Sequence, residues 1–239
     1  MDSVITVIRQ CQQRGEAPLS VIDLVERELL TATQAAWLID RIQRGSSWLV
    51  GALPGGAGKT TLMSALLAFV PDGENAVRVS PQAPWPTYGR GWCAVSEEIS
   101  DHGLPNYLWG ADVRGLASVP AQGGRITATI HADTLEQARE QIACQCGARE
   151  EGLAAFRLFI PIEVRFADEA GPSANPRHRA VAQRTVRRIY YHEEGAWRTL
   201  ERAPAPTPEL APIVAFLDDC RATGSSSCES IRQAWLARG

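Results

Sequence analysis

A glycine-rich turn between an apolar strand pattern and a helix pattern is the feature that most constrains this fold. Ser47–Val50 is a short apolar run, and residues 51–61 have the sequence Gly-Ala-Leu-Pro-Gly-Gly-Ala-Gly-Lys-Thr-Thr. Apolar side chains then recur at the spacing of one helix face, at Leu62, Ala65, Leu66 and Phe69. A strand, a tight loop and a helix in this order are typical of a mainly parallel sheet covered by helices, so an α/β core is expected.

The glycine-rich segment also predicts a ligand. Residues 53–60 match the phosphate-loop pattern G-x-x-x-x-G-K-[ST], except that Leu53 stands at the first glycine position. In such a loop the backbone N–H groups form a concave cradle for phosphate oxygens at the positive end of the following helix. Lys59 would then contact the β- and γ-phosphates of ATP, and the Thr60 hydroxyl would ligate Mg²⁺. The predicted nucleotide-binding residues are Pro54, Gly55, Gly56, Ala57, Gly58, Lys59, Thr60 and Thr61.

The use of lysine supports this prediction. The sequence has 24 Lys and Arg residues, and all of them except Lys59 are arginine. Because the two side chains carry the same charge, this position needs a compact ammonium rather than a planar guanidinium. With 27 Asp and Glu residues the net charge is −3, which argues against a protein that coats nucleic acid.

Other features of the sequence predict a cytoplasmic protein. No apolar run reaches the roughly 18–20 residues of a membrane span, and Met1–Arg14 lacks the basic-then-apolar pattern of a signal peptide. Six cysteines in a chain of this length predict reduced thiols rather than a disulfide framework. Cys144 and Cys146 are too close in sequence for a zinc knuckle, so no metal is expected there.

Changes in periodicity divide the chain into four parts. Thr31 and Gln34 form a capping box that opens an amphipathic helix in the first part. The predicted domains are N-terminal helices at 1–45, the P-loop core at 46–155, an antiparallel β meander packed on the core at 156–202, and a C-terminal helical segment at 209–239.

The meander is predicted from alternation. Every second position of 156–166 is apolar, which predicts one long half-buried strand, and further strands are expected over 185–192 and 196–200. A polar loop at 168–179 separates the first two strands, and a stiff proline-rich linker at 203–208 leads to the last two helices.

A second candidate site element lies at 126–136. Alternation over 126–131 predicts a strand whose polar face carries Thr127, Thr129 and His131. Asp-Thr-Leu-Glu at 133–136 predicts the cap of the next helix. His131 therefore stands between a strand end and a helix start, which favours a place in the site. The alternative is a histidine that only satisfies the end of its strand.

The acidic residue has two candidates. Trp92–Val95 predicts an apolar strand that delivers Glu97 and Glu98 at its C-terminal end, where the sites of α/β proteins lie. One carboxylate would hold Mg²⁺ through water, and another would orient the attacking water. Asp112 is the rival, but it lacks a comparable strand before it, so Glu98 is preferred. Arg114, close to Asp112, is either a phosphate contact or a solvated helix charge.

These motifs resemble a known family. The loop at 51–61, the segments on both sides of it and the Thr-Ala-Thr-Ile-His-Ala box at 127–132 resemble the traffic ATPases of type II and type IV secretion and pilus systems. The resemblance covers roughly residues 20–200. It implies a RecA-like P-loop NTPase core with an appended antiparallel meander and C-terminal helices, and it places His131 near the γ-phosphate. The family has Gly-Glu at the acidic strand end and an arginine after it, whereas this chain has Ser96 before Glu97 and Ser100 at the arginine position.

The same resemblance implies an activity and partners. In this family Mg²⁺-dependent ATP hydrolysis drives motion in a hexameric ring. ATP and ADP, further copies of the chain and components of a secretion or pilus machine are therefore the expected partners. In the short segment before the loop, no counterpart of the family's N-terminal domain is expected.

Two other functions remain open. Leu53 and the displaced acidic box also fit a regulatory or assembly module that binds nucleotide with little or no hydrolysis. A P-loop kinase is the third hypothesis, and the histidine box argues against it.

A basic cluster at Arg184, Arg187 and Arg188 is predicted on one strand. Such a cluster is usually a solvated face, and the alternative is an interaction surface.

Overall fold

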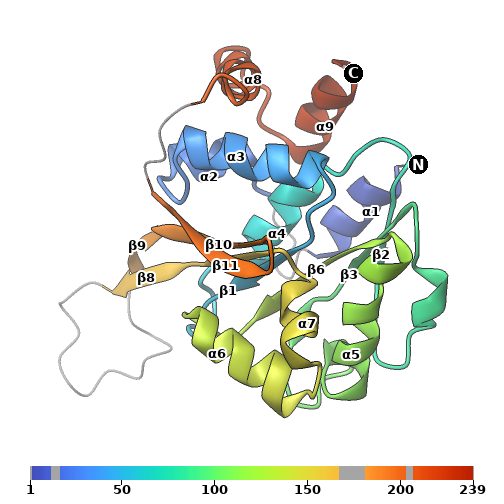
Figure 1. The fold of residues 1–239 in the computed structure, drawn as a ribbon. Helices are drawn as coiled ribbons and strands as arrows, with labels where there is room; N and C mark the ends of the chain where they lie inside the picture. Colours follow the sequence, from blue (N-terminus) through green and yellow to red (C-terminus); the bar gives the residue numbers. More distant parts are fainter. Residues whose placement is uncertain (1, 12–16, 167–180, 203–206, 239) are drawn as a thin grey trace.

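The computed structural model of the chain describes residues 2–11, 17–166, 181–202 and 207–238 (Figure 1). The predicted polar loop at 168–179 lies outside these residues, as does most of the proline-rich segment at 203–208. No helix among the described residues combines the length and the apolar character that a membrane crossing requires.

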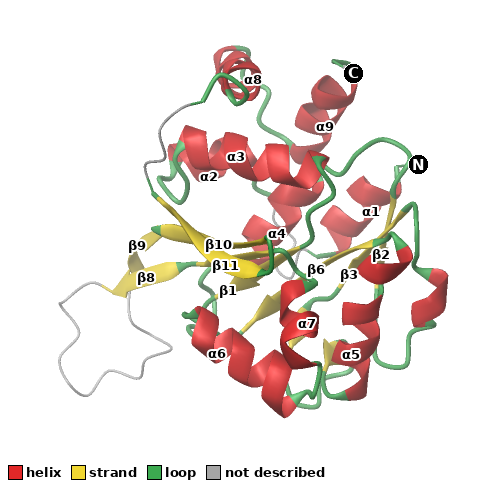
Figure 2. Ribbon diagram, viewed as in Figure 1, coloured by secondary structure: helices red, strands yellow, loops and turns green. Residues whose placement is uncertain are grey.

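A central sheet organises the molecule (Figure 2). Within the described residues it has nine strands, and its main path runs β11-β10-β7-β1-β6-β3-β2. The short strand β4 pairs with β6 and with β5. Its strands are β1 (Trp48–Gly51), β2 (Asn75–Arg78), β3 (Trp92–Val95), β4 (Glu98–Ile99), β5 (Tyr107–Leu108), β6 (Arg125–Ile130), β7 (Leu158–Pro161), β10 (Arg188–Glu193) and β11 (Ala196–Glu201). A separate antiparallel pair contains β8 (Glu163–Phe166) and β9 (Val181–Thr185).

The middle of the sheet is parallel. Strands β7, β1, β6, β3 and β2 run in one direction, while β10 pairs antiparallel with β7 and β11. Val50 of β1 is in register with Thr129 of β6 and Ile160 of β7. These three strands are buried along their whole length, as expected for parallel strands covered on both faces. The predicted α/β class is confirmed.

Helices cover both faces of the sheet (Figures 1 and 2). One core cluster joins the sheet to α1, α2, α3, α4, α8 and α9, and the other joins it to α5, α6 and α7. The helices are α1 (Ser3–Gln10), α2 (Val21–Glu26), α3 (Ala32–Gln43), α4 (Lys59–Leu67), α5 (Ala111–Ser118), α6 (Leu135–Arg139), α7 (Arg149–Ala154), α8 (Ala211–Ala222) and α9 (Cys228–Leu236). The two helices expected after the proline-rich segment are α8 and α9.

Helix α4 differs from its prediction. The sequence predicts one apolar face, but every residue from Leu62 to Leu67 is buried. The reason is that α4 lies on β1 and β6 and is covered by α1, α2 and α3. A helix enclosed in this way has no solvent face to define an amphipathic pattern.

The helix caps follow the sequence closely. The capping box of Thr31 and Gln34 is present at the start of α3, as predicted. The cap of α6 is shifted by one residue: Thr134 is the N-cap and Gln137 completes the box, rather than Asp133 and Glu136. The Asp133 side chain is used elsewhere, because its carboxylate accepts a hydrogen bond from the Leu53 N–H.

The single long strand predicted over 156–166 is wrong. Its first half is β7 in the central sheet, and its second half is β8, which pairs with β9. The change occurs at Pro161, which is in register with Gly51, the last residue of β1. Since β1 ends there, the ladder has no partner strand beyond that point. The predicted strand over 185–192 is likewise divided between β9 and β10 at Val186, whose N–H donates to the Leu29 carbonyl.

Candidate functional site

The glycine-rich segment joins the C-terminal end of β1 to the first turn of α4. Gly56 and Gly58 have φ values of 74° and 97°, a conformation that glycine adopts without steric cost. Gly58 is the N-cap of α4, and no side chain caps this helix. The first N–H groups of α4 are therefore left without a side-chain acceptor, at the positive end of the helix dipole. This helix end can accept an anion.

Leu53 occupies the first glycine position of the motif without strain. Its φ is not positive, and its side chain is 47% exposed. Its backbone makes the contacts: the N–H donates to Asp133 Oδ1 at 2.7 Å, and the carbonyl accepts from His131 Nδ1 at 3.0 Å. The departure from the motif therefore leaves the loop intact, because only the backbone of Leu53 is used.

Lys59 and Glu98 form a buried ion pair below the loop. Lys59 Nζ lies 3.6 Å from Glu98 Oε2, and the two side chains are 7% and 9% exposed. Lys59 Nζ also donates to the Ala52 carbonyl at 3.3 Å. Glu98 Oε1 is buried and has no hydrogen-bond partner among the described residues. A buried carboxylate oxygen without a partner calls for a further ligand, such as water or a cation.

Burial also shifts the protonation of this pair. Desolvation raises the pKa of the Glu98 carboxyl, while the nearby Lys59 and His131 oppose this shift. Desolvation lowers the pKa of the Lys59 ammonium, and Glu98 opposes that shift. Each partner therefore supports the charged form of the other, and removing one would leave an uncompensated buried charge.

His131 lies at the rim of this ion pair. Its Nε2 is 3.9 Å from Glu98 Oε2, and its side chain is 35% exposed. Because a carbonyl only accepts, the contact with Leu53 assigns the proton of the neutral ring to Nδ1. Nε2 then donates only when the ring is an imidazolium. The next turn supports this position, since Gln141 Nε2 donates to the His131 carbonyl at 2.7 Å.

Glu97 points away from Lys59 and is used differently. Its carboxylate forms an ion pair with Arg78 at the end of β2, and its backbone carbonyl accepts from the Thr129 hydroxyl. Adjacent side chains on an extended chain point to opposite sides, which separates Glu97 from Glu98. The structure thus brings Lys59, Glu98 and His131 together and leaves Glu97 outside that group.

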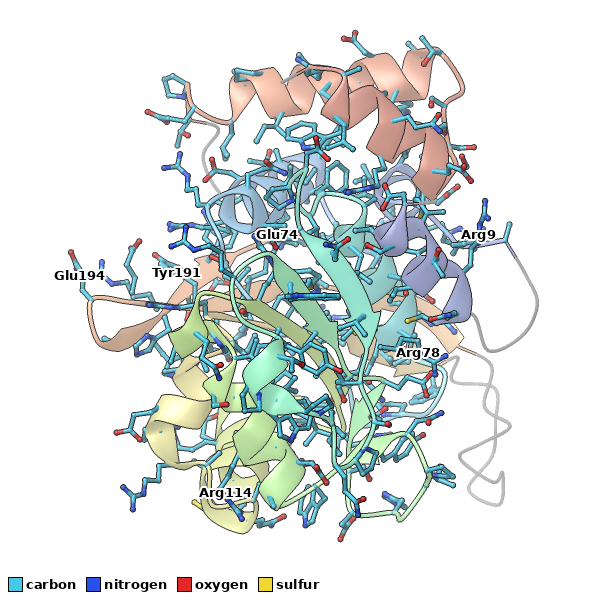
Figure 3. All side chains as sticks on the ribbon, turned by 90° about the vertical axis from the view of Figure 1, so that its right-hand side faces the viewer. Arg9, Glu74, Arg78, Arg114, Tyr191 and Glu194 are labelled. Carbon is cyan, nitrogen blue, oxygen red and sulfur yellow. The ribbon has the colours of Figure 1, made fainter. Side chains whose placement is uncertain are left out.

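The rival acid lies elsewhere. Asp112 is in the first turn of α5, where its Oδ1 accepts from the Gln82 N–H at 2.7 Å. Arg114 is exposed, and its Nη1 donates to the Cys146 carbonyl at 2.6 Å. Figure 3 shows Arg114 well separated from Arg78, which is the last residue of β2 and the ion-pair partner of Glu97.

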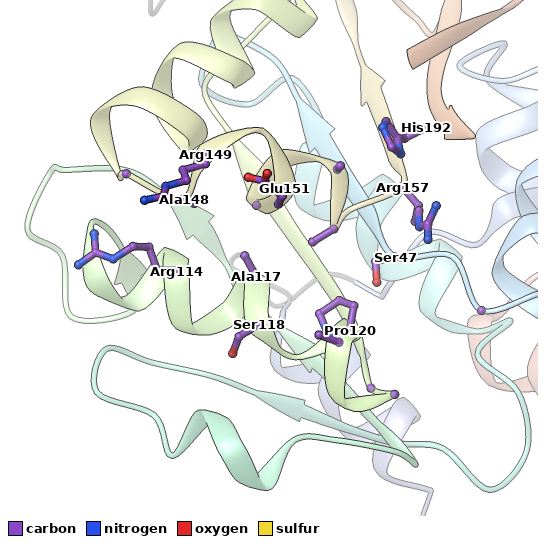
Figure 4. Close-up of a pocket in the computed structure, with 18 residues that line it drawn as sticks. Ser47, Arg114, Ala117, Ser118, Pro120, Ala148, Arg149, Glu151, Arg157 and His192 are labelled. Atoms are coloured by element: carbon purple, nitrogen blue, oxygen red, sulfur yellow. The ribbon is translucent and has the colours of Figure 1, made fainter. Parts of the chain in front are cut away.

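A cavity of about 750 Å³ lies at the opposite edge of the sheet, and we refer to it as the amino-edge cavity. It is lined by residues that precede three parallel strands: Ser47, Gly124 and Arg157. Figure 4 shows Arg149 and His192 among the other side chains around it. None of the residues that line it belongs to the glycine-rich loop.

Three contributors to the site were not predicted from the sequence. Arg78 pairs with Glu97, and Asp133 holds the start of the loop. Gly51 ends β1 where a Cβ would lie 2.3 Å from the Ala132 carbonyl, so glycine is required for close packing. Only Gly51 could have been found from the sequence, because it borders the motif. The contacts of Arg78 and Asp133 join separate segments of the chain, so no local pattern contains them.

The described residues contain no group of three or more His, Cys, Asp or Glu side chains that is arranged to hold a metal ion. All six cysteines are free thiols, and burial raises the pKa of Cys93 to about 12. The prediction of reduced thiols agrees with this arrangement.

The fold is α/β with a mostly parallel central sheet, and the glycine-rich loop, Lys59, Glu98 and His131 meet at the carboxyl edge of that sheet. The sequence matches no protein-family model, and no curated protein is significantly similar to it. Among solved structures, the chain is similar to the VirB11 ATPase from the Brucella suis type IV secretion system in complex with sulphate. The two share 16% sequence identity at a TM-score of 0.38, over 76% of this chain and 67% of the other.

Proposed function

We propose that this chain is a P-loop NTPase that binds ATP and hydrolyses it with Mg²⁺. One observation carries the proposal: the only lysine in the sequence is buried in the turn after the loop, 3.6 Å from a carboxylate whose second oxygen has no partner among the described residues. Desolvating both charges costs free energy that an ion pair often fails to recover, so such a pair is weak support for stability. Its place at a glycine-rich helix start favours a role in binding phosphate.

The loop residues would bind the triphosphate through backbone N–H groups. Pro54 to Gly58 form the cradle, and Thr60 and Thr61 add the first turn of α4. Lys59 would exchange its contacts with Ala52 and Glu98 for the β- and γ-phosphate oxygens.

Thr60 and Glu98 would hold the cation. Hydroxyl and carboxylate oxygens are the ligands that Mg²⁺ prefers, and the unpartnered Glu98 Oε1 suits this role. When bound, Mg²⁺ supplies neutralisation of the charge on the phosphates. Glu98 would also orient the attacking water, and His131 would donate from Nε2 to the γ-phosphate as an imidazolium.

A second function is favoured by the position of Glu97. Because Glu97 is paired with Arg78, Glu98 alone remains for both the cation and the water. This arrangement supports a regulatory or assembly module that binds nucleotide and turns it over slowly.

Release of inorganic phosphate by the purified chain tests the proposal. We expect Mg²⁺-dependent turnover of ATP in the parent and none in Lys59→Ala. ADP binding that is lost in Lys59→Ala, with no turnover in the parent, would favour the second function. Equal ADP binding by the parent and Lys59→Ala would contradict both.

The resemblance to traffic ATPases extends the proposal to a cytoplasmic, ring-forming protein that serves a secretion or pilus machine. Six free thiols are compatible with a reducing compartment. Light scattering with and without ATP tests the ring: a hexamer mass in ATP is expected, and a monomer in both conditions would contradict it.

A further inference from the structure

A second cavity, of about 640 Å³, opens directly beside the glycine-rich loop. One side is formed by Gly56, Gly58 and Thr61, and the other carries Arg184 from β9. We call this the loop-side cavity. Because Thr61 lies in the first turn of α4, a phosphate chain seated on that turn would lead from the loop into this space.

Arg184 reaches across the loop-side cavity to the loop itself. Its Nη2 donates to the Gly56 carbonyl at 3.1 Å, and its Cδ would lie 3.9 Å from a Cβ at Gly58. Its neighbour Arg187 instead pairs with Glu163, with Nε 3.0 Å from Oε2. The exposed Arg184 guanidinium is thus held beside the loop by a neutral acceptor, which an anion would replace with a stronger, charge-assisted contact.

The far wall of the loop-side cavity is largely apolar and also carries Arg27 and Glu28. Its apolar part is formed by Leu19, Leu24 and Leu29, of which the last two are 3% and 5% exposed. Apolar walls with a few polar groups at the rim are typical of sites for flat organic ligands.

This wall is fixed to the strand that carries Arg184. The Val186 N–H donates to the Leu29 carbonyl at 2.8 Å, and Arg202 Nη2 donates to the Glu28 carbonyl at 2.9 Å. Glu28 has a φ of 59°, which is uncommon outside glycine and is held by these neighbours. The two sides of the cavity are therefore preorganised relative to each other.

We propose that the loop-side cavity takes the nucleoside of ATP or ADP, and that Arg184 contacts the phosphates next to it. The inference rests on the proposed function, because it requires the loop to hold the phosphates. The planar guanidinium matches two phosphate oxygens at once, and the leucine wall packs against the base. The chain would in this way recognise the nucleoside through β9 as well as through the core.

Calorimetric titration with ADP and with inorganic pyrophosphate tests this proposal on the full chain. Arg184→Ala should weaken ADP about 10- to 100-fold, as expected for loss of a charged hydrogen bond. Arg187→Ala is the matched control, because Arg187 follows β9 and pairs with Glu163 rather than with the loop. It should leave ADP affinity unchanged, and Arg184→Lys should recover part of the loss.

A space-filling variant separates the nucleoside from the phosphates. Gln183 is exposed and lines the loop-side cavity on β9, where tryptophan is compatible with a strand. Gln183→Trp should weaken ADP about 10-fold or more and leave pyrophosphate unchanged.

The outcomes separate this inference from the proposed function. If Lys59→Ala abolishes ADP binding but Arg184→Ala behaves like Arg187→Ala, the role of Arg184 is wrong and the proposed function stands. If Gln183→Trp weakens both ligands equally or neither, the nucleoside lies elsewhere. If Lys59→Ala retains ADP binding, the proposed function fails first.

Discussion

The two edges of the central sheet present opposite combinations of volume and charge. At the carboxyl edge, Lys59 and Glu98 are 7% and 9% exposed and face each other at 3.6 Å. At the amino edge, a cavity of about 750 Å³ carries exposed arginines such as Arg149 and Arg157. Exposed charges remain hydrated, so placing them at the surface costs little free energy. The buried pair has lost its hydration, and this desolvation costs free energy that the ion pair must offset.

This difference indicates where chemistry is to be expected. A large cavity does not by itself indicate a ligand site, because water can form hydrogen bonds with its polar groups. A buried charge pair with an unpartnered carboxylate oxygen does indicate one, because perturbed ionisable groups cluster at sites that act on a ligand. Substitutions at the carboxyl edge should therefore change nucleotide binding or turnover, and substitutions at the amino edge should not.

The largest expected effect is on nucleotide binding. Lys59→Ala should weaken ADP by about 1,000-fold or more, because it removes a charged phosphate contact and leaves Glu98 unpaired. Lys59→Arg should also weaken binding, since the bulkier guanidinium does not fit beneath the loop. Arg149→Ala at the amino edge is the control, and titration calorimetry should find it unchanged. Equal losses of ADP affinity in Lys59→Ala and Arg149→Ala would contradict a binding site at the carboxyl edge alone.

Turnover should separate the two candidate acids. Glu98→Gln should slow ATP hydrolysis about 100-fold or more while retaining most of the ADP affinity, because it alters the positioning of water and transition-state charge. Asp112→Asn keeps the acceptor for the Gln82 N–H and should hydrolyse ATP like the parent. If a phosphate-release assay finds that Asp112→Asn slows hydrolysis and Glu98→Gln does not, the catalytic acid is Asp112 on α5.

His131→Ala should affect ATP and ADP differently. If Nε2 donates to the γ-phosphate, turnover should fall about 10- to 100-fold, while ADP raises the melting temperature as much as in the parent. A histidine that only supports the loop through Leu53 would instead lower the melting temperature and weaken both nucleotides. Thermal melts with each nucleotide distinguish the two roles.

In the absence of Mg²⁺, the affinity for ADP should fall as pH rises. Burial lowers the pKa of Lys59 and raises that of Glu98, so raising the pH favours a neutral lysine and an ionised glutamate. Both changes oppose an anion, and binding should therefore take up protons, with affinity falling by at most about 10-fold per pH unit for each proton. Titrations above about pH 7, where the phosphates are ionised, in two buffers of different ionisation enthalpy measure this uptake. Proton release on binding would contradict the assignment.

The smallest effect concerns the amino edge itself. Arg157 has a φ of 58°, a conformation that favours glycine, and its carbonyl accepts from the His192 N–H. Arg157→Gly keeps that backbone contact and should change the free energy of unfolding by less than about 1 kcal/mol, towards greater stability. Urea denaturation provides the measurement. A clear loss of stability would assign the guanidinium a structural role at this edge.

Local patterns predicted the parts of the fold that depend on neighbouring residues. Trp92–Val95 is a strand as predicted, and the box at Thr31 caps its helix, because both signals lie within a few residues. The division of 156–166 could not be predicted in this way. It depends on β1 ending at Gly51, opposite Pro161, and the alternation of apolar residues continues across that point.

The same limit applies to the candidate site. The motif around Lys59 is contiguous, and the strand ends at Glu98 and His131 were expected to converge because parallel strands share an edge. The contact of Arg184 with Gly56 joins residues 128 positions apart, so no local pattern contains it. In the sequence Arg184 is one member of a basic cluster, and only the fold distinguishes it from Arg187.

The solitary lysine also makes this protein convenient for spectroscopy. A sample grown with nitrogen-15 lysine carries one labelled side-chain ammonium, because Lys59 is the only lysine in the sequence. Its burial against Glu98 slows proton exchange with water, which favours a detectable resonance. That single signal would follow occupancy of the loop directly, without assignment of any other part of the spectrum.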